Sequence, residues 1–343
     1  MTALRKKQTH VSMQDVADYA KVSKGTVSKV LNSRSDVSEK AKAKVLAACE
    51  KLEYSLNPNI QDLLRKGVTG HSQDIAFVLV GTEFANPSYA GMIDGISQGA
   101  EKHNLHLILS TLSGGEESIY SLPPAIRDHR AAGILISGSL NEKIISLIRD
   151  TGIPYVVIGN YPNSITAFSN SVELNIGNLM HLAIRELKLK NKTRIAMFYE
   201  DPGNYFSQIS FAEFKNALSA NGMTFMPELI FEGKGGDFNA FDVMEATLSK
   251  KKITFDAIIS LNFSASQEIA CQIIANFGRE KANHIIMTTV ANFTKKMPMP
   301  TILCEEVSSK LAAMGLELLV EKLKNPDMEI KRVAFTPNLK LCL

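Results

Sequence analysis

Residues 22–32, VSKGTVSKVLN, are the segment that decides the fold at the start of this chain. Ser23 can cap a helix over residues 24–31, because a serine oxygen accepts a hydrogen bond from the first helical turn. The apolar side chains that share the inner face of this helix are Val27, Val30 and Leu31. With these buried, lysines, small hydroxyl side chains and a glycine face outward. The segment therefore predicts a short amphipathic helix with a polar, positively charged outer face.

Two further helices are predicted around this one, the first capped by Ser12 and the last running from Ser38 to about Leu52. Only residues 21–23 separate the first helix from the second, so these two helices must cross steeply. The predicted inner positions of the flanking helices are Met13, Val16, Ala17, Ala20, Ala41, Val45, Ala48 and Leu52. The pattern is typical of an all-α helix-turn-helix head.

The outer face of the second helix suits a DNA groove. Lys24 and Lys29 can reach base acceptors or phosphates, and Gly25 adds no bulk that would prevent close approach. Residues 1–70 contain 13 Lys and Arg against 7 Asp and Glu, a net charge of +6 in a chain of net charge +3. A basic head on an acidic body favours a polyanionic partner. The alternative is an ordinary solvated face of a small helical bundle.

Residues 53–70 are predicted to be a linker with one short helix over about 60–66, because Asn57-Pro58 and two glycines interrupt the pattern. Two helical turns are not stable alone in water. The linker is therefore either a tether or a hinge that folds when it binds a partner.

After residue 72, short apolar runs alternate with helical patterns. The runs lie at 75–80, 105–109, 133–136, 155–158, 194–199, 256–260 and 285–290. Continuous apolar strands separated by helices predict parallel sheets covered on both faces, and a break near 160–171 divides them into two α/β lobes. Ligands bind beyond the carboxyl ends of such strands, so we expect a site in the cleft between the lobes.

Other classes of protein are less well supported. The chain contains no GxGxxG, GxxxxGK[ST] or HExxH motif, so an α/β enzyme, the second hypothesis, lacks a catalytic constellation. Its four cysteines lie far apart, which favours buried thiols over a metal site or a disulfide, and we expect no cofactor. The basic, polar start and the lack of a membrane-length apolar run predict a cytoplasmic protein with no membrane partner.

The segment VSMQDVADYAKVSKGTVSKVLNSRSDVSEKAKAKVLAACEKLEY, residues 11–54, closely resembles the DNA-binding head of the LacI/GalR family. The body is similar to that family in its order, with Asn86-Pro87-Ser88-Tyr89 after the first strand and Asn262 after a later one. The resemblance implies a transcriptional regulator, repressor activity and a two-lobed body like that of periplasmic binding proteins. The implied domains are a head at 1–56, a hinge at 57–71 and an effector-binding and dimerisation body at 72–343, with an N-lobe at about 72–160 and 292–324 and a C-lobe at about 161–291 and 325–343.

The resemblance also implies site residues in the head and hinge. The DNA-binding positions are Ser23, Lys24, Gly25, Thr26, Ser28, Lys29 and Asn32. Leu64, followed by Arg65, falls where the family's hinge helix enters the minor groove and kinks the DNA. A homodimer would bind a pseudo-palindromic double-stranded operator. Lys21 stands where the family usually has glycine, which predicts about 1 kcal/mol of strain if the residue is left-handed. Asp62 stands where a basic hinge residue is usual, which predicts weaker binding or a different central spacing.

The implied effector pocket departs from the family pattern. Its candidate residues are Ser88, Tyr89, Ser137, Asn160, Phe206, Ser210, Asn262, Phe263, Asn292 and Glu306. Ser210 stands where the family carries an effector-binding arginine, Glu213 stands before Phe214 where the family has glycine, and Phe263 replaces an aspartate. A typical sugar would lack its usual partners. Either a more apolar or aromatic small molecule binds, or the phenylalanines close the cleft and no effector binds. A third hypothesis is a ligand-binding or scaffold protein with a vestigial head.

Overall fold

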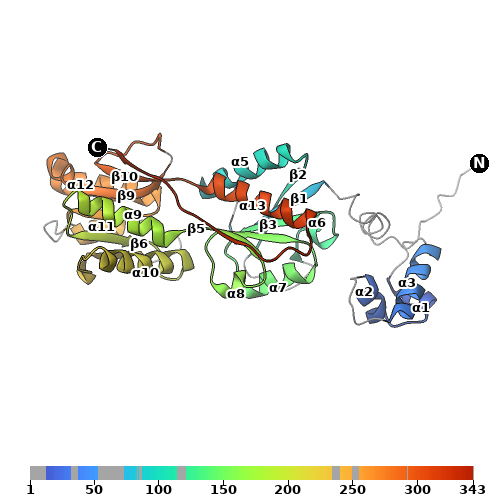
Figure 1. The fold of residues 1–343 in the computed structure, drawn as a ribbon. Coiled ribbons are helices and arrows are strands. Elements are labelled where there is room, and N and C mark those ends of the chain that lie inside the picture. Colours follow the sequence, from blue (N-terminus) through green and yellow to red (C-terminus); the bar gives the residue numbers. More distant parts are fainter. Residues whose placement is uncertain are drawn as a thin grey trace, which may run out of the picture.

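The computed structural model describes residues 13–31, 38–52, 73–82, 84, 87–113, 121–233, 240–248, 255–291 and 293–342. It contains a small helical head followed by two α/β lobes, and Figure 1 shows the head set apart from the lobes. Each lobe is built on one six-stranded sheet with helices on both faces. The predicted fold class is confirmed.

The head consists of α1 (Met13–Ala20), α2 (Lys24–Leu31) and α3 (Glu39–Lys51). The Ser23 oxygen accepts a hydrogen bond from the Thr26 amide at 3.0 Å, and the Ser38 oxygen accepts one from the Ala41 amide at 3.3 Å, as predicted for helix caps. Ser12 lies outside the described residues. The fully buried centre of the head contains one valine from each helix, Val16, Val27 and Val45.

The N-lobe sheet has the strand order β11-β5-β4-β3-β1-β2, and all its pairings are parallel. Its strands are β1 (Asp74–Val80), β2 (His106–Leu112), β3 (Gly133–Gly138), β4 (Tyr155–Ile158), β5 (Asn170–Leu174) and β11 (Arg332–Phe335). The helices of the lobe are α5 (Pro87–Lys102), α6 (Pro124–Arg127), α7 (Glu142–Asp150), α8 (Asn163–Thr166) and α13 (Ser308–Lys324). Helices α5 and α13 cover one face of the sheet, and α6 and α7 cover the other.

The C-lobe sheet has the order β12-β10-β9-β8-β6-β7, which repeats the topology of the N-lobe. Its strands are β6 (Ile195–Tyr199), β7 (Ile230–Glu232), β8 (Ala257–Ile259), β9 (Ile286–Ala291), β10 (Thr301–Glu305) and β12 (Leu339–Cys342). Its helices are α9 (Ile176–Leu189), α10 (Tyr205–Ala220), α11 (Ala240–Leu248) and α12 (Phe263–Ala282), with a short 3-10 turn at Pro227–Leu229. Unlike the other strands, β12 is antiparallel to its neighbour β10.

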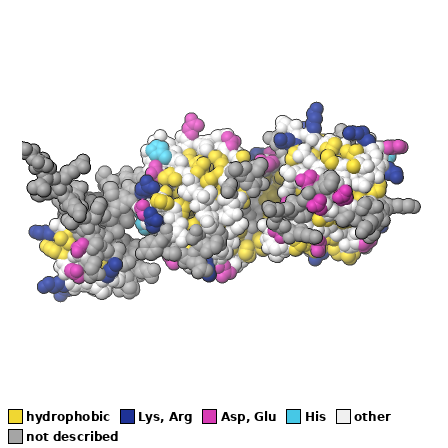
Figure 2. Space-filling view, turned by 180° about the vertical axis from the view of Figure 1, so that it is seen from behind, with side chains coloured by type: hydrophobic (Ala, Val, Ile, Leu, Met, Phe, Trp, Pro, Cys, Tyr) yellow, Lys and Arg dark blue, Asp and Glu magenta, His cyan; other side chains and the backbone are white. Residues whose placement is uncertain are grey.

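The chain crosses between the lobes three times, after β5, after β10 and after β11. Each crossing leaves from the carboxyl end of a strand that has a parallel neighbour, so the carboxyl ends of both sheets face the junction. This explains why β12 is antiparallel, because it enters the C-lobe sheet from the end at which β10 leaves it. Figure 2 shows the surface hollowed between the two lobes.

The predicted lobe limits need correction at three strands. The sheet pairings place β5 and β11 in the N-lobe, although residues 161–291 and 325–343 were predicted to belong to the C-lobe. They place β10 in the C-lobe, although residues 292–324 were predicted to belong to the N-lobe. The first crossing follows β5 rather than the polar break near 160–171, because β5 completes the N-lobe sheet before the chain leaves it.

Candidate functional site

A left-handed turn sets the crossing of α1 and α2. The Val22 amide donates to the Ala17 carbonyl at 3.0 Å, and the Lys21 amide donates to the Asp18 carbonyl at 3.4 Å, which is the Schellman pattern. Lys21 has a φ of 54°, in the region that favours glycine. The strain predicted at Lys21, about 1 kcal/mol, is therefore present in the turn.

The start of α2 presents a polar surface. Lys24 and Gly25 are exposed, and Thr26 is half-buried. The hydroxyl groups of Ser23 and Thr26 lie 2.8 Å apart, so each positions the other beside the first turn of the helix. Ser28 and Lys29 lie within α2, but their side chains and the whole of Asn32 are outside the described part of the head. Roles of these residues in DNA contact remain predictions.

Lysines dominate the described surface of the head. Its exposed lysines are Lys21, Lys24, Lys40, Lys42, Lys44 and Lys51. The exposed acidic side chains in the same residues are Asp15 and Asp18. Figure 2 shows several of these basic groups at the outer surface of the head. The head therefore has the charge that attracts a nucleic acid backbone.

Gly25 is not required by the packing of the head. A Cβ atom built at this position would meet only the Ser23 oxygen at 3.7 Å, which is an ordinary van der Waals contact. A glycine inside a helix costs about 1 kcal/mol relative to alanine. The head thus carries an exposed glycine that reduces its stability without an internal steric reason.

Replacing Gly25 with alanine is expected to stabilise α2 and to weaken DNA binding by about tenfold, because the added methyl group would lie between the helix and the groove. Amide hydrogen exchange of the full-length chain measures the first effect, and fluorescence anisotropy with a selected duplex measures the second. Ala47→Gly, at an exposed position of α3, makes the reverse change and should destabilise its helix without altering intrinsic DNA affinity. If Gly25→Ala bound the duplex as tightly as the wild type, Gly25 would not be part of the DNA-binding face.

The predicted hinge residues Leu64 and Arg65 lie outside the described residues. Their assignment to the minor groove stays a prediction from the sequence.

The N-lobe wall of the junction is held by side chains bonded to strand ends. The Ser137 hydroxyl donates to the Ile158 carbonyl at 2.8 Å. The Asn160 amide group donates to the Leu174 carbonyl at 2.7 Å, and its oxygen accepts from the Leu174 amide at 3.2 Å. Both predicted pocket residues therefore use polar atoms to hold neighbouring strands together.

Two tyrosines lie at the same wall. Sequence reasoning missed Tyr161, whose hydroxyl donates to the Gly138 carbonyl at 2.7 Å. Burial raises the pKa of Tyr161 and also that of the predicted Tyr89. Ser88 lies in the first turn of α5, and its side chain is outside the described set. The signal for Tyr161 was its position just after β4 at the carboxyl edge of the sheet.

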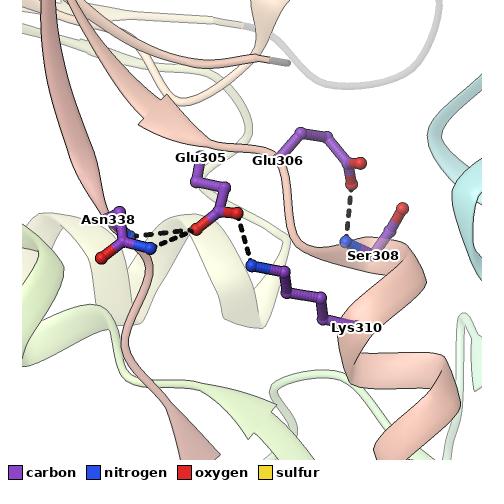
Figure 3. Close-up of polar contacts among 5 residues, drawn as sticks. All are labelled: Glu305, Glu306, Ser308, Lys310 and Asn338. Carbon is purple, nitrogen blue, oxygen red and sulfur yellow. Dashed lines mark hydrogen bonds and ion pairs between the residues drawn. The ribbon is translucent and has the colours of Figure 1, made fainter. Parts of the chain in front are cut away.

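Carboxylates organise the second and third crossings, as Figure 3 shows. Glu305 forms an ion pair with Lys310 of α13 and accepts a hydrogen bond from the Asn338 amide group at 2.8 Å. The hydrogen bond from Lys310 lowers the pKa of Glu305, and the Asn338 donors add to this effect against the opposing effect of burial. The predicted pocket residue Glu306 instead accepts from the Ser308 amide at 2.6 Å and caps the start of α13. These contacts tie two crossings to one helix.

The C-lobe wall contains a recess of about 280 Å³ that includes space open to solvent. It lies at the carboxyl ends of β6 and β8 and the start of α10. Its lining residues are Met197, Phe198, Tyr199, Glu200, Phe206, Ser207, Ser210, Ser260 and Leu261. The structure thus brings together the predicted Phe206 and Ser210, although the Ser210 hydroxyl donates to the Phe206 carbonyl at 2.7 Å.

Glu200 is the carboxylate of this recess, and sequence reasoning missed it. The Asn262 amide group donates to Glu200 Oε1 at 2.7 Å, while Asn262 Oδ1 accepts from the Ala265 amide at 3.1 Å and caps α12. Burial raises the pKa of Glu200, although the bond from Asn262 partly opposes this shift. The missed signal was a carboxylate directly after the apolar run 194–199.

The predicted Phe263 and a further phenylalanine, Phe293, are not among the residues that line the recess. Phe263 begins α12, and the Lys295 ammonium lies 5.9 Å from its ring centre. Phe293 has the Lys340 ammonium 5.8 Å from its ring centre. Asn292 is outside the described residues. Phe206 therefore contributes a ring to the recess, and the other two rings contact lysines.

Comparison with known proteins agrees with this organisation. Residues 12–57 match the family model for bacterial regulatory proteins of the lacI family. The HTH-type transcriptional repressor PurR of Aliivibrio fischeri is 24% identical over 341 residues, covering 96% of each chain. RegA of Clostridium acetobutylicum is 32% identical over 150 residues, 43% of this chain and 42% of its own. MalR of Streptococcus pneumoniae is 26% identical over 153 residues. This match spans 43% of this chain and 45% of the length of MalR.

Solved structures share the fold over nearly the whole chain. The lac repressor dimer bound to operator and the anti-inducer ONPF has a TM-score of 0.65 at 18% identity, with coverage of 97% of this chain and 98% of that one. The complex of the transcriptional regulator CelR with cellobiose has a TM-score of 0.65 at 19% identity, with coverage of 96% and 98%.

A helix-turn-helix head on a two-lobed, periplasmic-binding-like body defines a class of DNA-binding transcriptional regulators. Residues 12–57 match the lacI family of that class, and the chain is similar over most of its length to regulators such as PurR and catabolite control protein A. Its relatives are regulators, and the hypothesis of an α/β enzyme is not supported. Within the described residues, no helix is long and apolar enough to cross a membrane, and no cluster of side chains is suited to holding a metal ion.

Proposed function

We propose that this protein is a repressor that binds a pseudo-palindromic operator as a homodimer and is regulated by a small molecule at the junction of its lobes. The observation that carries the DNA-binding part is the lysine-rich head whose α2 exposes Lys24 and Gly25 at its start. One head is large enough for one half-site, and two heads related by a two-fold axis require an inverted repeat. The operator and dimer named for the lac repressor structure support this assignment by similarity of fold.

The regulatory part of the proposal follows from the crossings. Closure of the lobes would change the geometry at the second and third crossings together, because a hydrogen bond between Glu305 and Asn338 joins them. A ligand at the junction shifts the equilibrium only if it prefers one degree of closure. Such a shift would change the spacing of the two heads and hence the affinity for the operator.

Selection of bound sites from random duplex DNA with the purified full-length chain tests this proposal. We expect recovery of an inverted repeat whose two halves match and whose spacing is constant, because two identical heads on a fixed body contact both halves. Val27→Asp, which places a charge at a fully buried position of the head, is the control and should recover no motif. Recovery of a single half-site by the wild-type chain would contradict the dimer, and recovery of no motif at low salt would contradict the proposed function.

A further inference from the structure

The recess in the C-lobe contains the carboxylate of Glu200, for which the described part of the chain supplies no cationic partner. Among the described residues, no Lys, Arg or His forms an ion pair with Glu200, and the hydrogen bond found for it comes from the neutral amide of Asn262. A partly buried carboxylate has lost much of its hydration, and one neutral hydrogen bond compensates only part of that loss. A cation bound in the recess would compensate the rest of the hydration free energy that the Glu200 carboxylate has lost.

A second polar group in the recess also has an unused hydrogen-bonding capacity. Ser207 is 8% exposed and lines the recess, and no partner for its hydroxyl is found among the residues that the structure describes. By contrast, the hydroxyl of Ser210 is bonded to the Phe206 carbonyl. A buried hydroxyl facing a recess is suited to accept from, or donate to, a ligand.

The charges around the recess disfavour an anionic ligand. Asp201 and Glu232 lie close enough to Tyr199 to raise its pKa, in addition to the effect of burial, and Asp201 acts in the same direction on Glu200. The nearby lysines Lys215 and Lys295 lie over the rings of Phe211 and Phe263 rather than against Glu200. The local field therefore favours positive charge.

Most of the remaining lining is apolar or aromatic, and the hydroxyl of the polar exception, Ser260, donates to the Asn262 carbonyl at 3.4 Å. Met197, Phe198, Phe206 and Leu261 provide carbon surface, and none of the lining residues is basic. A ring near a bound ammonium adds a favourable cation–π contact. This combination lacks the many polar groups that a carbohydrate needs for its hydroxyls.

We propose that the recess binds a small protonated amine with an apolar or aromatic body, whose ammonium group contacts Glu200 and Ser207. The proposal rests on the proposed function, because it identifies the chemical class of the effector at the lobe junction. Asn262 is a positioning residue, since its amide group holds Glu200 Oε1 while its own oxygen caps α12. The recess, the unpaired carboxylate and the unpartnered hydroxyl are independent observations that point to the same ligand class.

Calorimetric titration of the full-length protein without DNA tests this inference. The probes are 2-phenylethylamine and isopentylamine, compared with 2-phenylethanol, isopentanol and phenylacetate. We expect at least one amine to bind, and its alcohol and phenylacetate to bind at least about tenfold more weakly. Absence of binding by both amines, or stronger binding by phenylacetate, would overturn the proposal.

Variants separate direct contact from folding. Glu200→Gln keeps the size of the side chain and should weaken amine binding by about tenfold or more, and Ser207→Ala should weaken it by a smaller factor. Lys281→Ala, an exposed change on the last turn of α12, is the matched control and should bind the amine like the wild type. Circular dichroism measures whether each variant folds. If Glu200→Gln does not fold, the amine affinity of Ser207→Ala still tests the proposed contact. Equal amine affinity in all four proteins would overturn the assignment.

DNA binding measured without amine distinguishes this inference from the proposed function. Glu200→Gln should bind the selected operator as the wild type does, because Glu200 lies in the C-lobe and not in the head. If the wild type recovers no operator, the proposed function fails even if amines bind. If the operator is bound and no amine binds, only the ligand class is wrong.

Discussion

Raising the salt concentration from about 50 to about 200 mM is expected to reduce the affinity of the full-length chain for its operator by about 10³-fold, or about 4 kcal/mol. This is the loss for about six neutralised phosphates, because each contact releases condensed counterions whose return opposes binding at high salt. The exposed lysines of the described head supply the charge for such contacts. Fluorescence anisotropy over a series of salt concentrations measures the slope.

Single lysine variants give this measurement its control. Lys24→Ala should reduce the slope of log affinity against log salt by about 1 if its ammonium contacts a phosphate. Lys281→Ala removes the same charge from the C-lobe and should leave the slope unchanged. A flat salt dependence of the wild-type chain would contradict DNA binding and would support the scaffold hypothesis with a vestigial head.

Replacing Gly95 with alanine is expected to destabilise the N-lobe by about 3 kcal/mol. A Cβ atom at Gly95 would lie 2.0 Å from the Ser309 carbonyl oxygen and 2.9 Å from the Ser309 Cα atom. These are backbone atoms of α13, so the clash cannot be relieved by a side-chain rotation. The two helices must separate, and the apolar surface between them would lose contacts.

Thermal unfolding of the full-length chain, with hydrogen exchange of amides in α5 and α13, measures this effect. Ser97→Ala, an exposed change on the same helix, is the control and should alter stability by no more than about 0.5 kcal/mol. Because α13 follows directly after the second crossing, Gly95→Ala should also disturb the Glu306 cap at its start. Wild-type stability of Gly95→Ala would show that α5 and α13 do not pack as closely as described.

Several parts of the structure follow directly from local sequence patterns. The helix bounds at residues 24–31 and the caps at Ser23 and Ser38 were predictable because capping depends on a few neighbouring residues. The strand at 155–158 was predictable to the residue because a short, continuous apolar run is typical of a strand buried on both faces.

Other strands carried a weaker local signal. Strand β5 begins with Asn170 and Ser171, polar residues that are nevertheless buried. Asn170 Oδ1 accepts from the Lys331 amide at 2.7 Å, so its burial depends on a segment 161 residues away. Strands β11 and β12 lie at sheet edges and contain no fully buried residue, so neither forms a continuous buried apolar run that a sequence search would find.

The candidate site shows the same division. The outer face of α2 was predictable because burying one side of a short helix determines which residues remain outside. The junction was not, because its carboxylates come from segments distant in sequence: Glu200 follows β6 and is held by Asn262, and Glu305 meets Asn338. The side chains of predicted pocket residues such as Ser137 and Asn160 donate hydrogen bonds to backbone carbonyls of neighbouring strands. The sequence alone could not identify these acceptors.

The sequence by itself determined the helical head, its basic outer face, the alternation of strands and helices in the body and the family resemblance, because these depend on periodicity, capping and charge within short segments. Only the tertiary structure decided which strands complete each lobe, where the three crossings lie and which carboxylate lines the recess. These features depend on pairings between distant segments, and a one-dimensional pattern does not specify which buried polar atom meets which partner.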